Sequence, residues 1–322
     1  MSASSAREVR LERRLRDALK DHGFLYLANH GIQDDILEGA AEAMRRFFAL
    51  PLEEKSKLHT DFTRVHPRTS RGFILKEALN TSRGEDIKEV LDIGREGSEA
   101  ALAIPFQGPN VWPATLPPED FKLPILRHQE AMWDLACDMT RAIALSLALP
   151  ETFFDQFVDD PIIIHRLNYY PAHLSPGPNH IACGEHTDYG FFTLLQQVGG
   201  SEDLEVHAGG QWVPVPAVPG MLNFNIGDLM DVWSNGLYRA TLHRVITKQR
   251  CERGSLAFFF DPNYEAIVEP VPTSVSAESP QKYSKVQAGR RKLAKYEAVW
   301  RELDKTAKLE EGEGVWLFRQ AD

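Results

Sequence analysis

Two histidines and an aspartate have the residue types and the spacing of a catalytic metal site. His186 and Asp188 are two residues apart, and His243 lies in a later segment of similar composition. If Glu185 to Gln197, which is rich in Tyr, Phe and Thr, forms one strand, side chains two apart face the same side, so His186 and Asp188 would point to one place. Two imidazoles and one carboxylate bind one face of non-haem Fe(II) and leave positions open for oxygen and a co-substrate. The iron triad (His186, Asp188 and His243) therefore predicts a catalytic site, because structural sites fill their coordination sphere with protein ligands.

Arg253 and Ser255 repeat the two-residue spacing shortly after the triad. On a strand through Gly254 to Phe260, both would face inward and present a guanidinium group and a hydroxyl to an incoming carboxylate. Phe259 shares the parity of Ser255, so we place it near the co-substrate. This segment predicts that the metal site takes a carboxylate-bearing partner.

Ordinary structural roles compete with these interpretations. Asn168 and Tyr170, also two apart, fit a strand-ending turn before Pro171 as well as they fit a site. The first two triad residues could form a buried hydrogen-bonded pair, with the third on the surface. We favour metal binding, because the triad, the strand context and the following Arg-x-Ser occur together in one β region.

Two other acidic positions have simpler explanations. His59-Thr60-Asp61 repeats the His-x-Asp pattern, but it follows a charged helical stretch, Glu53 to Lys57, where nothing turns both side chains to one side. We interpret that triplet as solvated. Asp228 follows Gly227 between predicted strands, which is typical of a turn whose carboxylate binds its own backbone.

Composition limits the class of protein. The chain has 322 residues, 43% of them hydrophobic, enough for one large or two modest domains with a substantial core. Its formal charge of -10 argues against a nucleic-acid or anionic-membrane surface. No apolar run reaches the roughly 20 residues that span a bilayer, and the N-terminus lacks the apolar centre of a secretory signal. The three cysteines (Cys137, Cys183 and Cys251) are widely spaced and indicate no disulfide framework, so we expect a protein of the reducing cytoplasm. Nothing in the sequence requires more than a monomer.

Helical patterns precede and follow a β-rich centre. From Ile162 to Ile267, short apolar runs alternate with Gly and Pro turns, which predicts a β-sandwich or barrel, in its jelly-roll version with the metal site at the mouth. Thr60 to Thr115 is predicted to be irregular and partly extended. We expect one mainly β domain with supporting helices, divided into an N-terminal helical and irregular region (1–120), a catalytic core with its backbone helix (121–275) and a C-terminal helix with a tail (276–322). The predicted helices cover Arg7 to Lys20, Asp34 to Leu50, Leu52 to Leu58, Leu123 to Leu149 and Ser279 to Lys305, with a strand at Phe24 to Leu27.

Five motifs together carry a family resemblance. They are NYYP at 168–171, HTDYGFFTLL at 186–195, NFNIGDLMDVWSNG at 223–236, ATLHRV at 240–245 and RGSLAFFFDPN at 253–263. The chain resembles the Fe(II)/2-oxoglutarate-dependent dioxygenases of the isopenicillin N synthase-like superfamily, and residues 23–31 and 88–94 are similar to the N-terminal region of that family. Among its branches it looks most like the bacterial and fungal one with thymine 7-hydroxylase-like and ethylene-forming-enzyme-like proteins. One departure is that members usually open with a short IPxIDL strand before the first helix, whereas this chain starts with the helix.

The resemblance implies a double-stranded β-helix in which the triad binds iron. It implies that Arg253 and Ser255 bind the distal carboxylate of 2-oxoglutarate, assisted by Tyr170 and Asn168. The implied activity couples oxidative decarboxylation of 2-oxoglutarate to oxidation of a small organic molecule, with hydroxylation favoured. Fe(II), 2-oxoglutarate and O2 are the implied cofactor and co-substrates, with ascorbate in a supporting role.

Two alternatives remain open, and the substrate is not specified. An iron oxidase of the same superfamily that does not use 2-oxoglutarate also carries Arg-x-Ser, and a non-catalytic β-sandwich could bind a metal or a carboxylate. The residue types allow an aromatic molecule, a nucleobase or an amphipathic acid as substrate. We expect the substrate pocket to include Arg71, Phe73, Phe192, Trp233 and Phe259.

Overall fold

Two antiparallel β-sheets form the centre of the molecule in a computed structural model. It describes residues 3–59, 70–75, 88–98, 101, 104–172, 181–199, 202–246 and 252–297. The seven strands of the larger sheet are β1 (Phe24–Ala28), β2 (Gly72–Ile74), β3 (Glu89–Ile93), β4 (Pro161–Tyr170), β6 (Phe192–Val198), β9 (Met221–Ile226) and β11 (Arg253–Asn263). The four strands of the smaller sheet are β5 (Ile181–His186), β7 (Leu204–Ala208), β8 (Gln211–Pro214) and β10 (His243–Ile246).

The strand order is that of a jelly roll. The larger sheet runs β1-β9-β6-β11-β4-β3-β2 and the smaller runs β5-β10-β7-β8, so the chain passes repeatedly from one sheet to the other. After β11 in the sequence, β12 (Ile267–Val268) and β13 (Val286–Gln287) pair in a separate two-stranded antiparallel sheet. The predicted mainly β fold with a double-stranded β-helix core is confirmed, and the same architecture occurs in solved oxygenase structures described below.

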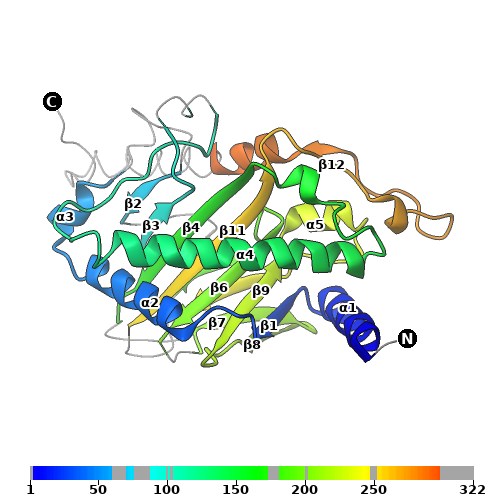
Figure 1. The fold of residues 1–322 in the computed structure, drawn as a ribbon, viewed down its shortest axis with the longest axis horizontal. Helices are drawn as coiled ribbons and strands as arrows, with labels where there is room; N and C mark the ends of the chain where they lie inside the picture. Colours follow the sequence, from blue (N-terminus) through cyan, green and yellow to red (C-terminus); the bar gives the residue numbers. More distant parts are fainter. Residues whose placement is uncertain are drawn as a thin grey trace.

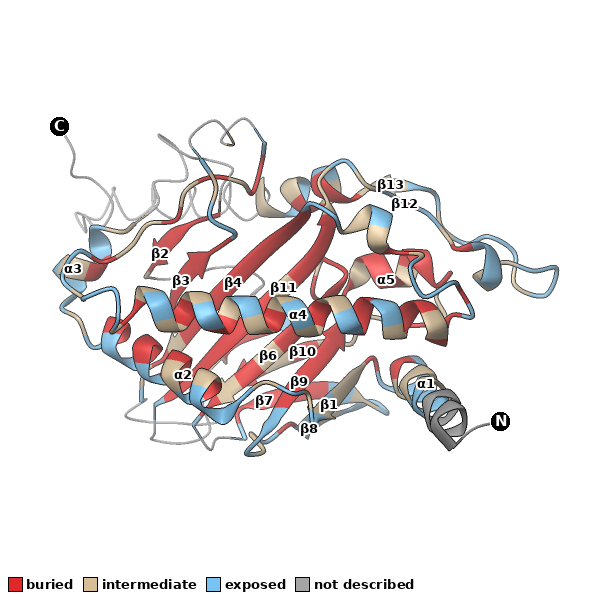
Figure 2. Ribbon diagram, viewed as in Figure 1, coloured by how far each residue is buried: buried red, intermediate tan, exposed pale blue. Residues whose placement is uncertain are grey.

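Helices cover one face of the larger sheet, where α4 crosses the strands with α2 beside it (Figure 1). Their apolar positions repeat at helical spacing: Ile125, Met132, Ala136 and Ile143 of α4 are all buried. The strands beneath them are largely buried too (Figure 2). Because α2 and α4 pack against this face of the larger sheet, a small molecule can bind only on the other face, between the two sheets. The helices are α1 (Ala3–Asp21), α2 (Asp34–Phe48), α3 (Leu52–Ser56), α4 (Lys122–Ser146), α5 (Asp228–Trp233), the 3-10 turns η2 (Asp155–Phe157) and η3 (Pro272–Ser274), and residues 288–297.

Some of the predicted elements are wrong in extent. Residues 279–285 are irregular and are followed by β13, so the C-terminal helix starts at 288 rather than at Ser279, and its predicted end lies outside the described residues. The Thr60 to Thr115 region was predicted to be irregular and partly extended, and β2 and β3 are extended parts of it. They pair with each other and extend the larger sheet beside β4. The three-part division of the chain stays a prediction. In the part of the chain that is described, no helix is both long and apolar enough to cross a membrane.

A stacked histidine pair lies between α4 and the larger sheet, on the face away from the predicted site. His128 Nδ1 is 3.1 Å from His165 Nε2, and His128 Nε2 is 2.8 Å from the Gln196 side-chain oxygen. Both rings are fully buried. Burial lowers the pKa of His128 to about 4 and the pKa of His165 well below its ordinary value. Both imidazoles are therefore neutral in the folded protein at neutral pH.

We expect acid to destabilise the protein through this histidine pair. The unfolded chain takes up protons as the pH falls below about 6.5, while the folded His128 resists protonation until about pH 4, so stability present above pH 6.5 is lost over that window. For His128 alone the loss is roughly 3 kcal/mol. Thermal unfolding of the metal-free chain between pH 7.5 and 4.5 measures it. His128→Asn should flatten the pH dependence, whereas the exposed-histidine control His22→Asn should leave it as steep as in the wild type; an equally steep profile for both would refute this role.

Candidate active site

The two histidines of the triad meet because β5 and β10 pair with each other. The antiparallel register places His243 directly opposite His186, and their ring centroids are 4.2 Å apart. His186 Nδ1 lies 2.7 Å from the Gly184 carbonyl oxygen, and His243 Nδ1 lies 2.9 Å from the Thr241 carbonyl oxygen. A carbonyl only accepts, so each Nδ1 carries the proton and each Nε2 keeps its lone pair for a metal. Burial, and then the neighbouring His186, lowers the pKa of His243 to about 4, which keeps that ring neutral and able to bind a metal.

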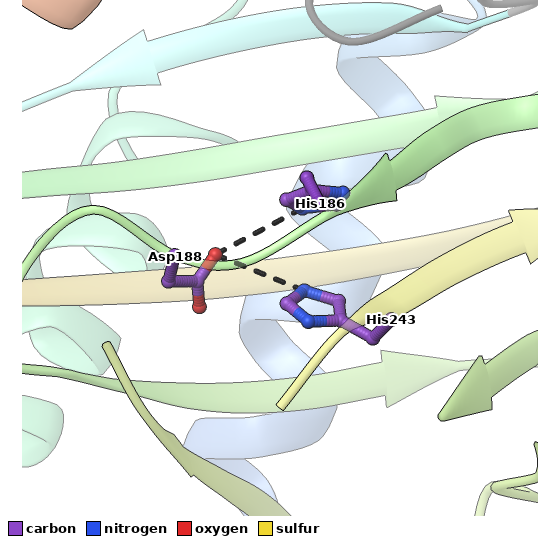
Figure 3. Close-up of side chains that lie close together, drawn as sticks. All are labelled: His186, Asp188 and His243. Carbon is purple, nitrogen blue, oxygen red and sulfur yellow. Dashed lines mark ion pairs between the residues drawn. The ribbon is translucent and has the colours of Figure 1, made fainter. Parts of the chain in front are cut away.

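Asp188 completes the triad from a turn and not from a strand. The predicted single strand from Glu185 to Gln197 is wrong: β5 ends at His186, residues 187–191 cross from the smaller to the larger sheet, and β6 begins at Phe192. Asp188 Oδ1 lies 3.9 Å from His186 Nε2 and 3.7 Å from His243 Nε2 (Figure 3). One ligand atom from each triad residue lies within 4.8 Å of the others.

The second carboxylate oxygen of Asp188 is held by hydrogen bonds. Thr193 donates its hydroxyl to Oδ2 at 2.5 Å, and Asn225 donates its side-chain amide to the same oxygen at 2.6 Å. Burial opposes ionisation, but the two imidazoles and these two hydrogen bonds outweigh it and lower the pKa of Asp188. Oδ1 alone is directed at the imidazoles, so the carboxylate is arranged to bind a metal through one oxygen and to leave more coordination positions to other ligands.

Arg253 and Ser255 lie side by side on the cavity face of β11, as the parity predicts. The register with β4 places Arg253 opposite Tyr170 and Ser255 opposite Asn168. Asn168 donates its side-chain amide to the Ser255 hydroxyl at 3.2 Å, and the guanidinium carbon of Arg253 lies 4.8 Å from the centre of the Tyr170 ring. All four side chains line the cavity that contains the triad.

The Arg253 guanidinium has unused hydrogen-bonding capacity directed into this cavity. Its Nη2 donates to the Gln197 side-chain oxygen at 3.1 Å, but Nε and Nη1 are buried without a hydrogen-bond partner among the described residues. A buried N–H group without a partner is costly, and a carboxylate bound beside the guanidinium would supply an acceptor. The residues present therefore fit a ferrous ion bound by the triad and a carboxylate co-substrate bound by Arg253.

Of the five residues predicted to contact substrate, Phe259 lines the cavity. The prediction finds no support for the other four. Phe192 and Trp233 pack in the core under α4, and Phe73 packs against the α2 side of the larger sheet. Arg71 is buried beside Gly94, donates to the carbonyl oxygens of Ser70 and Phe106, and is not among the residues that line the cavity. The cavity is also lined by residues that were not predicted from the sequence, among them Lys88, Arg166, Thr193, Asn225, Lys292 and Tyr296.

Of the two competing acidic positions, Asp228 does not join the triad, and Asp61 cannot be compared because it lies outside the described residues. His59 is partly buried and forms a β-bridge with Phe73, whereas the Thr60 and Asp61 of that triplet lie outside the described residues. Asp228 was predicted in a turn, but it is the first residue of α5, and its carboxylate lies 3.7 Å from Nη2 of Arg291.

Fold and site together define a non-haem iron oxygenase with a double-stranded β-helix core. Residues 163–262 match the 2OG-Fe(II) oxygenase superfamily, and residues 1–115 match the N-terminal region described as that of a non-haem dioxygenase in morphine synthesis. Homoarginine-6-hydroxylase 2-ODD-C23.1 of Arabidopsis thaliana is 36% identical over 266 residues, which cover 80% of this chain and 78% of the relative. The chain belongs to the 2OG-Fe(II) oxygenase superfamily.

Other relatives and a solved structure agree. The 2-oxoglutarate-dependent dioxygenase caaD of Aspergillus niger is 31% identical over 84% of this chain and 83% of the relative. A full-length Neurospora crassa protein, solved in complex with alpha-KG, superposes with a TM-score of 0.78 at 29% identity, covering 89% of this chain and 91% of that one. The protein is thus a 2-oxoglutarate-dependent dioxygenase that uses Fe(II). When bound, the iron supplies the oxidation chemistry, with 2-oxoglutarate and O2 as its co-substrates.

Proposed function

We propose that this enzyme hydroxylates a small carboxylate-bearing molecule in a reaction driven by 2-oxoglutarate. The observation that carries the proposal is that the triad and the buried, partly unsatisfied Arg253 guanidinium line one cavity. A chelating keto acid requires a metal with open coordination positions at one end and a carboxylate-binding group, such as the planar Arg253 guanidinium, at the other. This arrangement favours use of 2-oxoglutarate over the co-substrate-independent oxidase.

In this proposal the side chains around the triad have distinct tasks. Arg253 binds the distal carboxylate of 2-oxoglutarate through its guanidinium, and Ser255 adds its hydroxyl. Tyr170 supports the guanidinium with its ring, while Asn168 orients the Ser255 hydroxyl. Gln197 holds Nη2 of Arg253, so the guanidinium is already oriented before the co-substrate arrives.

Lys88 is the residue from which we infer the acidic group of the substrate. Its side chain is 4% exposed and lines the cavity, with Nζ 3.4 Å from Cys183 Sγ, which is in turn 3.9 Å from His186 Nδ1. A buried ammonium in the same cavity as the triad attracts an anionic group and fixes the end of the molecule that carries it. The relatives named homoarginine-6-hydroxylases support this inference, because homoarginine carries a carboxylate.

The test is succinate formation by the iron-loaded enzyme with a panel of candidate substrates. Homoarginine and simpler amino and keto acids represent the carboxylate class, and thymine, the ligand in a second structure of the Neurospora crassa protein, represents neutral rings. We expect a carboxylate-bearing compound to stimulate succinate release more than thymine does. Stimulation by neutral compounds alone would rule out the substrate class, and no consumption of 2-oxoglutarate with any compound would rule out the whole proposal.

Lys88→Met should raise KM for the carboxylate substrate about ten- to a hundredfold, the range expected for one charge-assisted hydrogen bond. The KM for 2-oxoglutarate should stay unchanged, since Arg253 serves that co-substrate. Lys88→Arg should retain most of the affinity, and the exposed-lysine control Lys57→Met should be neutral. Parallel increases in both KM values would show that Lys88 does not serve the substrate alone.

We further propose that the enzyme acts as a cytoplasmic monomer without a nucleic-acid or membrane partner. Cys137 and Cys183 are free thiols, which suits a reducing compartment. Size-exclusion chromatography with light scattering tests the oligomeric state.

A further inference from the structure

The segment that carries Asp188 is held on one side by the start of α5. Residues 227–229 donate three backbone hydrogen bonds to it: Gly227 N–H to Phe191 O at 2.9 Å, Asp228 N–H to Asp188 O at 2.8 Å and Leu229 N–H to Gly190 O at 3.0 Å. These bonds fix the main chain of residues 188–191 from one direction. They do not by themselves prevent movement away from α5.

On the other side, the same segment rests against the Asp261 carboxylate. The Phe191 N–H donates to Asp261 Oδ1 at 3.0 Å, and a Cβ atom added to Gly190 would overlap this carboxylate. Asp261 therefore packs directly on the main chain two residues after the proposed iron ligand. Any shift of Asp261 would be transmitted to Asp188, because the intervening segment is confined between two packed neighbours.

Lys292 determines where the Asp261 carboxylate lies. It projects from the C-terminal helix at residues 288–297, and its ammonium forms an ion pair with Asp261 Oδ2. Lys292 is 5% exposed and Asp261 is 2% exposed. Three aromatic rings surround the ammonium, with centroids at 5.7 Å for Phe106, 6.0 Å for Phe259 and 5.5 Å for Tyr296. A buried charge that is paired and enclosed in this way has one position, unlike a surface lysine.

We propose that Lys292 is a positioning residue for the iron site: through Asp261 it presses the 187–191 segment against α5 and so fixes the carboxylate of Asp188. The C-terminal helix is thereby a determinant of iron affinity, although it contributes no ligand. The inference rests on Asp188 being an iron ligand. It assigns to Lys292 a role that operates before 2-oxoglutarate or substrate binds.

The experiment is calorimetric titration of the full-length metal-free chain with Mn(II) alone, in the absence of 2-oxoglutarate and substrate. Lys292→Met should weaken Mn(II) binding about ten- to a hundredfold, the range for residues that orient a metal ligand. Lys292→Arg retains the pair and should bind within a few-fold of the wild type. Because removal of Lys292 leaves Asp261 buried without its cation, the milder Asp261→Asn is a second variant that keeps an acceptor for the Phe191 N–H and should also weaken Mn(II) binding.

Two matched controls separate positioning from general damage. Arg290→Met removes a positive charge from the exposed side of the same helix, and Lys55→Met breaks a buried lysine pair, that with Glu89, outside the cavity and on the α2 side of the larger sheet. Both should keep the wild-type Mn(II) affinity. Wild-type affinity in Lys292→Met and Asp261→Asn, with only a lower unfolding temperature, would overturn the proposal. A contact of Lys292 with substrate cannot produce the expected result, since no substrate is present, and failure of the wild type itself to bind Mn(II) would instead count against the proposed iron triad.

Discussion

His243→Ala should abolish metal binding and turnover together. Removing this imidazole leaves one histidine and one carboxylate as possible ligands. His186, which lies opposite His243 in the β5–β10 register, would no longer have a second imidazole beside it to bind the same metal. Residues that do not touch the metal but hydrogen-bond to a metal-ligating side chain already contribute about ten- to a hundredfold to metal affinity. Loss of the ligand itself should therefore weaken Mn(II) or Fe(II) binding by more than about a hundredfold. Anaerobic titration and succinate release measure the two effects.

The matched control for this variant is His207→Ala. His207 is an exposed histidine on β7, a neighbouring strand of the same sheet, where its ring packs edge-on against Trp212. It should retain metal affinity and turnover. A His243→Ala enzyme with wild-type succinate release would remove the triad from consideration, whatever its effect on stability.

Arg253→Ala should weaken 2-oxoglutarate binding about ten- to a hundredfold while leaving metal affinity unchanged. The lost interaction is a charge-assisted pair worth about 1.5–3 kcal/mol, and each 1.36 kcal/mol is a factor of about ten. The effect should appear in KM for 2-oxoglutarate, because the carboxylate that Arg253 binds is remote from the reacting keto acid end. Titration of 2-oxoglutarate against succinate formation measures it.

Arg253→Lys distinguishes the fork from the charge. A lysine keeps the positive charge but lacks the planar pair of donors, so it should recover only part of the affinity. The control Arg95→Ala removes a half-exposed arginine that pairs with Asp160 on the surface, and it should be neutral. An unchanged KM for 2-oxoglutarate in Arg253→Ala would contradict the assignment and favour the oxidase that binds a different carboxylate with Arg-x-Ser.

Sequence alone determined the chemistry of the site, because that chemistry depends on the spacing of residues within one element and on which residue types occur together. The alternation of side chains along β11 places Arg253, Ser255 and Phe259 on one face, and any chain that forms this strand must do the same. The apolar stripe of α4 similarly follows from its helical period alone. The residue types of the triad, joined with Arg-x-Ser, leave few other metal chemistries open.

Tertiary structure decided everything that depends on which segments meet. His186 and His243 are neighbours because β5 and β10 pair in one register, a choice between strands 57 positions apart that no local pattern specifies. Asp188 reaches them from the segment between the two sheets, so it joins the triad where the chain crosses between sheets and not through the alternation of side chains along one strand.

The same distinction explains the missed and misplaced substrate residues. Phe192 and Trp233 are of residue types that often line pockets. Their positions on β6 and α5, however, direct both side chains toward the hydrophobic core that α4 covers. Lys292 belongs to no recognised motif, and Lys88 is the first residue of the 88–94 stretch, whose resemblance to the family assigned it no role. Each lysine enters the cavity wall because a strand and a helix distant in sequence pack against β4 and β11. Local periodicity determines which side a residue faces, but long-range packing decides what lies on that side. The common face of Arg253 and Ser255 follows from the first, whereas the meeting of the triad residues and the composition of the cavity wall follow from the second.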